Sequence, residues 1–192
     1  MSENTASMSG TELRKLLGSR DIQHVVVLGA NGTMGYGSAA LFTQAVPRVT
    51  FLARSREKAE EGLAAAIKQV RSPTVASRSD VGDYGVDLEK ALETADIVFE
   101  ALTEDLEIKR GIFDKVEKGR RADSIVATVT SGLSINQLCE GRSDSFRKHF
   151  MGLHFFNPPN VIVGTELIPI LRLCASRSRI AVRSSSVPNR RV

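Results

Sequence analysis

Three glycines stand at regular spacing in the segment VVVLGANGTMGYG, directly after an apolar run and before a helical pattern. In a turn that binds a dinucleotide, one glycine permits a sharp bend, a second lets the backbone approach the pyrophosphate, and a third lets the helix pack against the strand. The free N–H groups and the positive dipole end at the helix start then favour phosphate. The spacing, GxxGxxG, is one residue longer than the common GxGxxG, and an ordinary strand–helix turn also uses glycine. The strand before and the helix after favour a dinucleotide site, whose predicted cofactor contacts are Gly29, Ala30, Asn31, Gly32, Thr33, Met34 and Gly35.

The segment FLARSREK bears on which dinucleotide binds. NAD sites usually place an acidic residue near the end of the second strand, where it bonds the ribose 2′-hydroxyl. Here Ala53 stands at that position, and Arg54, Ser55 and Arg56 follow it. A cation and a hydroxyl suit a 2′-phosphate better than a bare ribose, whereas the alternative interpretation is a solvated basic loop. We predict Arg54 as a cofactor contact, and the choice between NAD and NADP stays open at this point.

His154 stands in the segment GLHFFNPPN, at the end of a predicted strand and beside aromatic residues and a turn. A lone histidine among apolar residues is more often part of a packed core than a catalyst. Its pKa near neutrality nevertheless suits a group that takes up and returns a proton in each turnover. The surrounding motifs decide between these two interpretations.

Four separated motifs occur in the order found in 3-hydroxyacyl-CoA dehydrogenases, and over about residues 22–169 the chain resembles that family. The family's HFFNP motif is present, and an acidic residue follows its histidine twelve residues later, as in the family. The segment FEALTEDLEIK matches the family's V-E-A-(x)-x-E-(x)₄-K pattern, and VTSGLSI matches its N-T-S-S-L loop. The combination is far more specific than any single motif. The matched positions are His154–Pro158, Glu166, Glu104, Lys109 and Ser131.

The resemblance implies an oxidoreductase of fatty acid metabolism that interconverts (S)-3-hydroxyacyl-CoA and 3-oxoacyl-CoA, with NAD or NADP accepting the hydride. His154 would be the general base that takes the proton of the 3-hydroxyl, and Glu166 would orient the imidazole and stabilise its charged form. Ser131 is implied as a further catalytic residue. Together with Asn157 it would donate hydrogen bonds near the substrate oxygen and the nicotinamide.

Glu104 and Lys109 are implied by the same resemblance as contacts on the cofactor side. Each of these assignments has a plainer alternative. Glu104 and Lys109 would then be a solvated pair at a helix start, Ser131 an ordinary loop residue, and Asn157 a turn residue before Pro158.

The chain also departs from the family's pattern. The longer glycine turn and the missing acid concern the cofactor, and Gly132 stands where the family often has a second serine. The helical hairpin that helps hold CoA in the family has no counterpart, so no residue is predicted to contact CoA. After Pro169 an arginine- and serine-rich segment replaces the helical domain that closes over the acyl chain and makes the family's dimer. We predict that this segment is disordered, and we hypothesise that a frameshift truncated the chain and weakened or abolished its activity.

An alternation of strands and helices must bring these residues together. Pro73 ends the second predicted helix, and residues 71–87 offer only a short strand near Thr74–Ala76. The alternation predicts an α/β, Rossmann-like, doubly wound and mostly parallel sheet with helices on both faces. The predicted strands are Ile22–Leu28, Val49–Leu52, Ile97–Leu102, Ile125–Val129 and Met151–Phe156, and the predicted helices are Thr33–Ala45, Arg56–Val70, Leu106–Val116 and Ile135–Cys139.

Charge and length limit the number of domains and the kinds of partner that the chain can have. The chain has 192 residues, enough for one domain with its own core, which we place at 21–169 between a polar arm at 1–20 and a basic tail at 170–192. The tail holds six of the 26 basic residues and no acid, so the remaining 20 basic residues face 22 acidic ones. The body is therefore close to neutral, and nothing in its charge predicts a nucleic-acid partner.

Further patterns exclude a membrane protein and a metal site. No apolar run approaches the roughly 20 residues that span a bilayer, and the first residues carry no secretory pattern, so we expect a cytoplasmic protein. Cys139 and Cys174 are too few for a disulfide framework, and no metal-ligand spacing accompanies them. Two other functions stay open, namely a non-catalytic module that binds or senses the dinucleotide and an NADP-dependent reductase of another substrate class on the same fold.

Overall fold

The computed structural model describes residues 21–159, 162 and 164–170, so the predicted arm and all but the first residue of the predicted tail lie outside the described residues. Within this part of the chain, seven strands form one sheet in the order β3-β2-β1-β4-β5-β6-β7, and all but β7 are parallel. The strands are β1 (His24–Leu28), β2 (Arg48–Ala53), β3 (Ser79–Asp83), β4 (Ile97–Glu100), β5 (Ile125–Thr128), β6 (Phe150–Phe155) and β7 (Thr165–Pro169). The helices are α2 (Thr33–Ala45), α3 (Arg56–Val70), α4 (Pro73–Ser77), α5 (Leu88–Leu92), α6 (Leu106–Gly119), α7 (Ile135–Leu138) and α8 (Asp144–Lys148).

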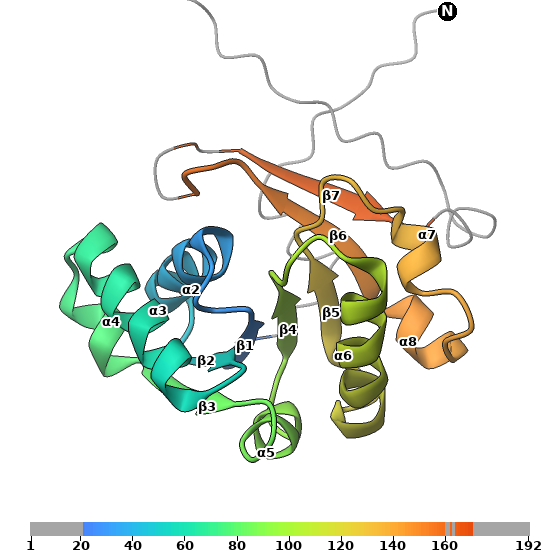
Figure 1. The fold of residues 1–192 in the computed structure, drawn as a ribbon, viewed down its shortest axis with the longest axis horizontal. Coiled ribbons are helices and arrows are strands. Elements are labelled where there is room, and N and C mark those ends of the chain that lie inside the picture. Colours follow the sequence, from blue (N-terminus) through green and yellow to red (C-terminus); the bar gives the residue numbers. More distant parts are fainter. Residues whose placement is uncertain (1–20, 160–161, 163, 171–192) are drawn as a thin grey trace, which may run out of the picture.

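Helices cover both faces of the sheet (Figure 1). Helices α2, α3 and α4 pack on one face, and α5, α6, α7 and α8 pack on the other. Strands that alternate with helices in this way form a doubly wound layer structure. The predicted Rossmann-like, mostly parallel α/β fold is therefore confirmed.

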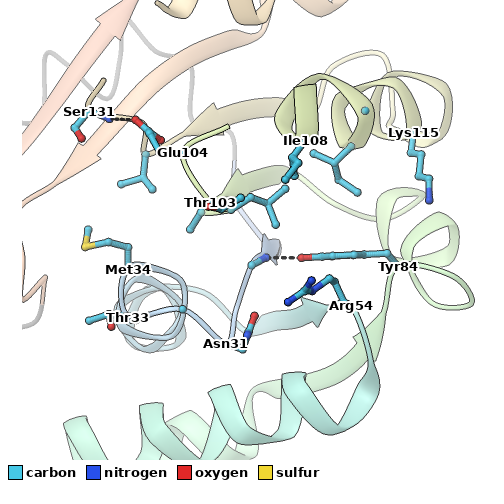
Figure 2. Close-up of a pocket in the computed structure, with 17 residues that line it drawn as sticks. Asn31, Thr33, Met34, Arg54, Tyr84, Thr103, Glu104, Ile108, Lys115 and Ser131 are labelled. Carbon is cyan, nitrogen blue, oxygen red and sulfur yellow. Dashed lines mark hydrogen bonds between the residues drawn. The ribbon is translucent and has the colours of Figure 1, made fainter. Parts of the chain in front are cut away.

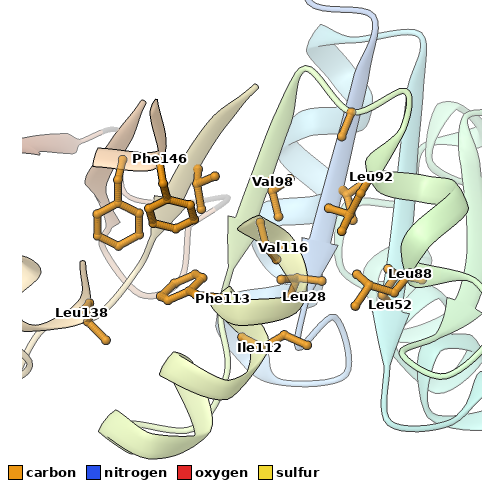
Figure 3. Close-up of a cluster of buried hydrophobic side chains, with 14 of the residues drawn as sticks. Leu28, Leu52, Leu88, Leu92, Val98, Ile112, Phe113, Val116, Leu138 and Phe146 are labelled. Atoms are coloured by element: carbon orange, nitrogen blue, oxygen red, sulfur yellow. The ribbon is translucent and has the colours of Figure 1, made fainter. Parts of the chain in front are cut away.

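The central strand β1 is buried along its whole length. Val25 and Val27 belong to the apolar cluster on the α2 and α3 side, whereas Val26 and Leu28 belong to the cluster on the α5 and α6 side. Figure 3 shows this second cluster, in which Phe113 of α6 packs among the side chains of the sheet. Two covered faces explain why the sequence of this strand is a continuous apolar run rather than an alternation.

Most predicted elements are present, with ends that coincide or differ by at most three residues, but one prediction is wrong. Residues Thr74–Ala76 lie in helix α4 and not in a strand. Ser72 caps this helix by accepting the N–H of Thr74, and Pro73 fits its first turn, where no N–H donor is needed. The strand of this region is β3, which lies at the edge of the sheet and has the polar sequence SDVGD. A polar edge strand gives no apolar run, so sequence reasoning did not find it.

Three further elements had no prediction, namely α5, α8 and β7. The two helices have five residues each, too short to show helical periodicity. The packed unit also extends past the predicted boundary, because Ile170 is only 3% exposed and joins the cluster that contains Leu138 and Phe150. None of the helices in the described residues is both long and apolar enough to span a membrane.

The sheet positions the candidate site through the direction of its strands. After β1 the chain passes to α2 on one face, and after β4 it passes to α6 on the other face. In an open α/β sheet, a crevice forms outside the carboxyl ends of the strands where successive connections diverge in this way. Strands β5 and β6 end at the same edge, so Ser131 and His154 also lie there.

Candidate active site

A cleft of about 1060 Å³ opens at this edge of the sheet. Asn31, Arg54 and Tyr84 lie toward one end of it, and Glu104 and Ser131 lie at the other (Figure 2). The cleft is lined by the glycine turn, the residues after β2 and β4, one side of α6, and the end of β5. The lining residues are Gly29, Asn31, Gly32, Thr33, Met34, Arg54, Tyr84, Ala101, Leu102, Thr103, Glu104, Ile108, Gly111, Ile112, Lys115, Val129 and Ser131.

The three glycines of the turn are required for different reasons. Gly29 has a φ of +79°, and a Cβ on it would lie 2.4 Å from the carbonyl oxygen of Ala101. A Cβ on Gly35 would lie 2.0 Å from the carbonyl oxygen of Gly29, so the close approach of α2 to the turn requires glycine there. A Cβ on Gly32 would meet nothing closer than 3.5 Å, an ordinary contact distance. The fold itself therefore does not require the middle glycine, and its open side faces the cleft.

The start of helix α2 leaves its positive end available to an anion. Its N-cap is Gly32, which supplies no side-chain cap, and its first turn holds no acidic residue. By contrast, Ser55 caps α3 and Asp105 caps α6, and both of those helices carry a glutamate in the first turn. Thr33 and Met34 of the first turn of α2 line the cleft. The first N–H groups of a helix have no acceptor within the helix, so this helix start, which holds no acidic residue, fits the pyrophosphate of a dinucleotide.

Arg54 is the residue of the basic segment that reaches the cleft. The hydroxyl of Ser55 caps α3, and Arg56 is held 3.0 Å from the carboxylate of Asp87 and 3.0 Å from the carbonyl oxygen of Val81. Of these three residues, Arg54 reaches the cleft, whereas Ser55 and Arg56 fix the start of α3.

Tyr84 is a cleft residue that sequence reasoning missed. It follows β3 in the least periodic stretch of the chain. Its hydroxyl accepts the N–H of Gly29 at 2.7 Å and donates to the carbonyl oxygen of Leu52 at 3.3 Å. Burial raises the pKa of Tyr84 to about 12, so the phenol stays protonated and keeps the donor that the second of these bonds requires.

Lys109 is fully buried and does not line the cleft, contrary to its predicted role as a cofactor contact. Its ammonium lies 2.7 Å from Oε1 of Glu100 and 3.4 Å from Oε2 of Glu104, and it donates to the carbonyl oxygen of Leu102 at 3.3 Å. Glu100 is also fully buried, and it accepts further hydrogen bonds from the Leu102 N–H and the Thr128 hydroxyl at 2.5 Å each. Side chains buried this deeply remain charged only when they are paired and hydrogen-bonded. Lys109 therefore stabilises the buried carboxylate of Glu100 beneath the cleft.

Glu104 fixes the loop that carries Ser131. Its carboxylate accepts the hydroxyl of Thr130 and the N–H groups of Ser131 at 3.0 Å and Gly132 at 2.8 Å. Partial burial acts to raise the pKa of Glu104, but these hydrogen bonds and the charge of Lys109 outweigh it and hold the pKa below its usual value. The carboxylate is therefore ionised at neutral pH, and it presents Ser131 at the wall of the cleft. The resemblance did not assign Glu100, Thr128 or Thr130, although an acid at the end of the apolar run IVFE indicates a buried partner.

His154 and Glu166 lie directly opposite each other in the antiparallel pairing of β6 and β7. The Nδ1 atom of His154 is 3.2 Å from Oε2 of Glu166, and the two side chains are 23% and 58% exposed. An ionised carboxylate can only accept, so the proton of a neutral imidazole lies on Nδ1 and the lone pair on Nε2. The geometry thus produces an oriented base at the carboxyl end of β6.

The structure brings the predicted residues into two groups at one edge of the sheet. Eight of them line the cleft, and His154 with Glu166 forms a separate pair on the neighbouring strands. Asn157 follows β6, is exposed, and does not line the cleft, while Ala30 and Gly35 are buried within the turn. The eight cleft residues are Gly29, Asn31, Gly32, Thr33, Met34, Arg54, Glu104 and Ser131.

Residues 24–173 match the family described as 3-hydroxyacyl-CoA dehydrogenase, NAD binding domain. The chain belongs to this family. The matched family is an NAD-binding domain of oxidoreductases, which agrees with the dinucleotide site that the glycine turn and the motifs predict.

Individual 3-hydroxyacyl-CoA dehydrogenases share the same part of the chain. A probable 3-hydroxyacyl-CoA dehydrogenase of Bacillus subtilis is 41% identical over 108 residues, which are 54% of this chain and 14% of the relative. The human mitochondrial hydroxyacyl-coenzyme A dehydrogenase is 26% identical over 181 residues, 87% of this chain and 55% of that protein. The crystal structure of (S)-3-hydroxybutyryl-CoA dehydrogenase from Ralstonia eutropha has a TM-score of 0.65 at 29% identity, covering 76% of this chain and 53% of that one. The chain thus spans about half, or less, of the length of these relatives.

Proposed function

We propose that this chain supplies the cofactor site and the catalytic base of a 3-hydroxyacyl-CoA dehydrogenase. The reaction is the transfer of hydride between C3 of a 3-hydroxyacyl-CoA and a nicotinamide dinucleotide. The observation that carries the proposal is the His154–Glu166 pair, with its 3.2 Å contact between the end of β6 and the start of β7, at the edge of the sheet where the cleft opens. A module that only binds or senses the dinucleotide needs the glycine turn but has no use for an oriented imidazole.

The proposed mechanism assigns the proton to His154. Its Nε2 atom would take the proton of the 3-hydroxyl, and a nicotinamide held in the cleft would supply the hydride chemistry at C3. Glu166 accepts a hydrogen bond from the Nδ1–H of His154 throughout and stabilises the imidazolium that forms, the role that a carboxylate plays beside a histidine base. In the reverse direction the same imidazolium returns its proton to the oxygen of the 3-oxo group.

The remaining residues position the reactants. Gly32 and the start of α2 hold the diphosphate, and Ser131, held by Glu104, donates a hydrogen bond toward the substrate oxygen or the nicotinamide. We also propose that the substrate is an acyl-CoA and that the protein is cytoplasmic. A dimer would form through the rest of a full-length family enzyme. The family membership and the names of the relatives support the substrate.

The replacement His154→Gln separates an enzyme from a binding module. We expect the variant to bind NADH within about twofold of the wild type, because the imidazole does not line the dinucleotide cleft. The oxidation of NADH by acetoacetyl-CoA should fall by about 10²- to 10⁴-fold, the usual contribution of a general acid–base group. Fluorescence titration measures the affinity for NADH, and absorbance at high protein concentration measures the rate of NADH oxidation.

A matched control is Glu61→Gln on the outer surface of α3, where the carboxylate pairs with Lys58 and does not line the cleft. This variant should keep both affinity and turnover. Turnover that survives unchanged in His154→Gln, or that is absent from the wild type, would leave a binding module and refute the catalytic part of the proposal.

A further inference from the structure

We infer that the cleft binds the 2′-phosphorylated dinucleotide more tightly than the unphosphorylated one, with Arg54 as the residue that sets this preference. The inference rests on the proposed function only in so far as a dinucleotide binds in this cleft. It concerns the end of the cleft opposite Ser131, where the carboxyl end of β2 would meet the adenosine ribose.

The carboxyl end of β2 lacks the acid that would bond a free ribose 2′-hydroxyl. The strand ends at Ala53, which is fully buried. Asp83, which pairs with Ala53 in the register of β2 and β3, accepts the N–H groups of Gly85 and Val86 and does not line the cleft. Among the described residues that line the cleft, Glu104 is the sole carboxylate, and it lies at the opposite end beside Ser131 (Figure 2). No cleft carboxylate is therefore placed to repel a phosphate at the ribose end.

Arg54 offers an uncommitted guanidinium at this end. Figure 2 shows its side chain between Asn31 and Tyr84, directed into the cleft. Among the described residues it has no ion-pair partner, whereas Arg56 two positions later is bound to Asp87 and Val81. A guanidinium presents planar, paired donors that match the oxygens of a phosphate, and it holds its charge at every working pH.

A second cation lies on the opposite wall of the cleft. Lys115 extends from α6 near Tyr84, so the ribose end carries two positive side chains and no negative one among its described lining residues. Hydrogen bonds between charged partners are the strong ones in proteins, and one of them lost corresponds to about a 10- to 100-fold change in affinity. We therefore expect NADPH to bind this protein about 10- to 100-fold more tightly than NADH.

The experiment is a calorimetric or fluorescence titration of the full chain with NADPH and NADH. The wild type is compared with Arg54→Gln and with the control Lys58→Gln. The control removes the same charge from the first turn of α3, where the ammonium pairs with Glu61 outside the cleft. In Arg54→Gln the affinity for NADPH should approach that for NADH, which itself should change by less than about threefold. Lys58→Gln should leave the ratio of the two affinities as it is in the wild type.

The outcomes distinguish this inference from the proposed function. Equal affinities in the wild type, or an Arg54→Gln variant that weakens both dinucleotides equally, would overturn the preference and leave the dinucleotide site intact. If neither dinucleotide binds, the proposed function fails together with the inference. Because Arg54 is exposed and has no ion-pair partner among the described residues, far-UV circular dichroism should show the same folded content in all three proteins.

Discussion

Lys109 matches the family's motif as closely as Glu104 does, yet the two side chains have different surroundings. Glu104 lines the cleft and holds the Ser131 loop, while Lys109 is fully buried beneath it and pairs with Glu100. A motif gives the type and order of residues, but how deeply a side chain is buried depends on the residues that the neighbouring strands place around it. Here Glu100 and Thr128 come from two adjacent strands, β4 and β5, and their partners could not be found from spacing along one segment.

The buried pair gives a prediction about stability. Lys109→Met should lower the free energy of unfolding by about 3–5 kcal/mol, because it leaves the carboxylate of Glu100 charged and unpaired in the interior. The double replacement Lys109→Met with Glu100→Gln should recover most of that loss, since no net charge then remains buried. Urea unfolding of the three proteins measures the difference. A loss below 1 kcal/mol in the single variant would show that Glu100 and Lys109 are solvated.

At the scale of elements, the long apolar and periodic segments were predictable and the short polar ones were not. Helices α2 and α3 begin and end where the sequence predicts, because glycine, serine and proline mark their ends. Strand β3 carries two aspartates at the edge of the sheet, and β7 depends on its pairing with β6. Tyr84 was missed for the same reason as β3. The contact of His154 with Glu166 depends on the antiparallel register, although the twelve-residue spacing had indicated the pair through the family resemblance.

The pairing of β1 with β2 contains a buried histidine that makes stability depend on pH. His24 is 3% exposed, with Nδ1 at 3.0 Å from the Thr94 hydroxyl and Nε2 at 2.8 Å from the Thr50 hydroxyl. Burial, assisted by the charge of Arg48, lowers the pKa of His24 to about 4. The unfolded chain takes up this proton near pH 6.5 and the folded protein only near pH 4. The stabilisation is therefore complete above pH 6.5 and is lost as the pH falls toward 4.

The size of this effect can be isolated by comparison with His24→Gln, which cannot titrate. Between pH 7 and pH 4 the free energy of unfolding of the wild type should fall by about 3 kcal/mol more than that of the variant. Chemical denaturation at each pH measures both curves. Parallel curves for the two proteins would mean that His24 is accessible to solvent in the folded state.

At the scale of the whole molecule, one edge of the sheet collects every feature on which the proposed chemistry depends. The glycine turn after β1, Arg54 after β2, Glu104 after β4, Ser131 after β5 and His154 at the end of β6 come from five successive parts of the chain. Parallel strands end at a common edge, and this property of the fold converts an order of motifs into a site. The structure shows that these residues form two groups, the residues that line the cleft and the His154–Glu166 pair.

The most direct test of this account is the affinity of the Gly32→Ala variant for NADH, measured by fluorescence titration beside the wild type and the control Glu61→Gln on the outer surface of α3. The protein leaves room for a methyl group at Gly32, since the nearest atom to a Cβ there lies at 3.5 Å. Both variants should unfold at about the same temperature as the wild type. We expect Gly32→Ala to bind NADH at least about tenfold more weakly, because its methyl group occupies the place of the diphosphate, and Glu61→Gln to bind nearly as the wild type does. Unchanged affinity in Gly32→Ala would contradict the account, because the dinucleotide would then bind without approaching the glycine turn.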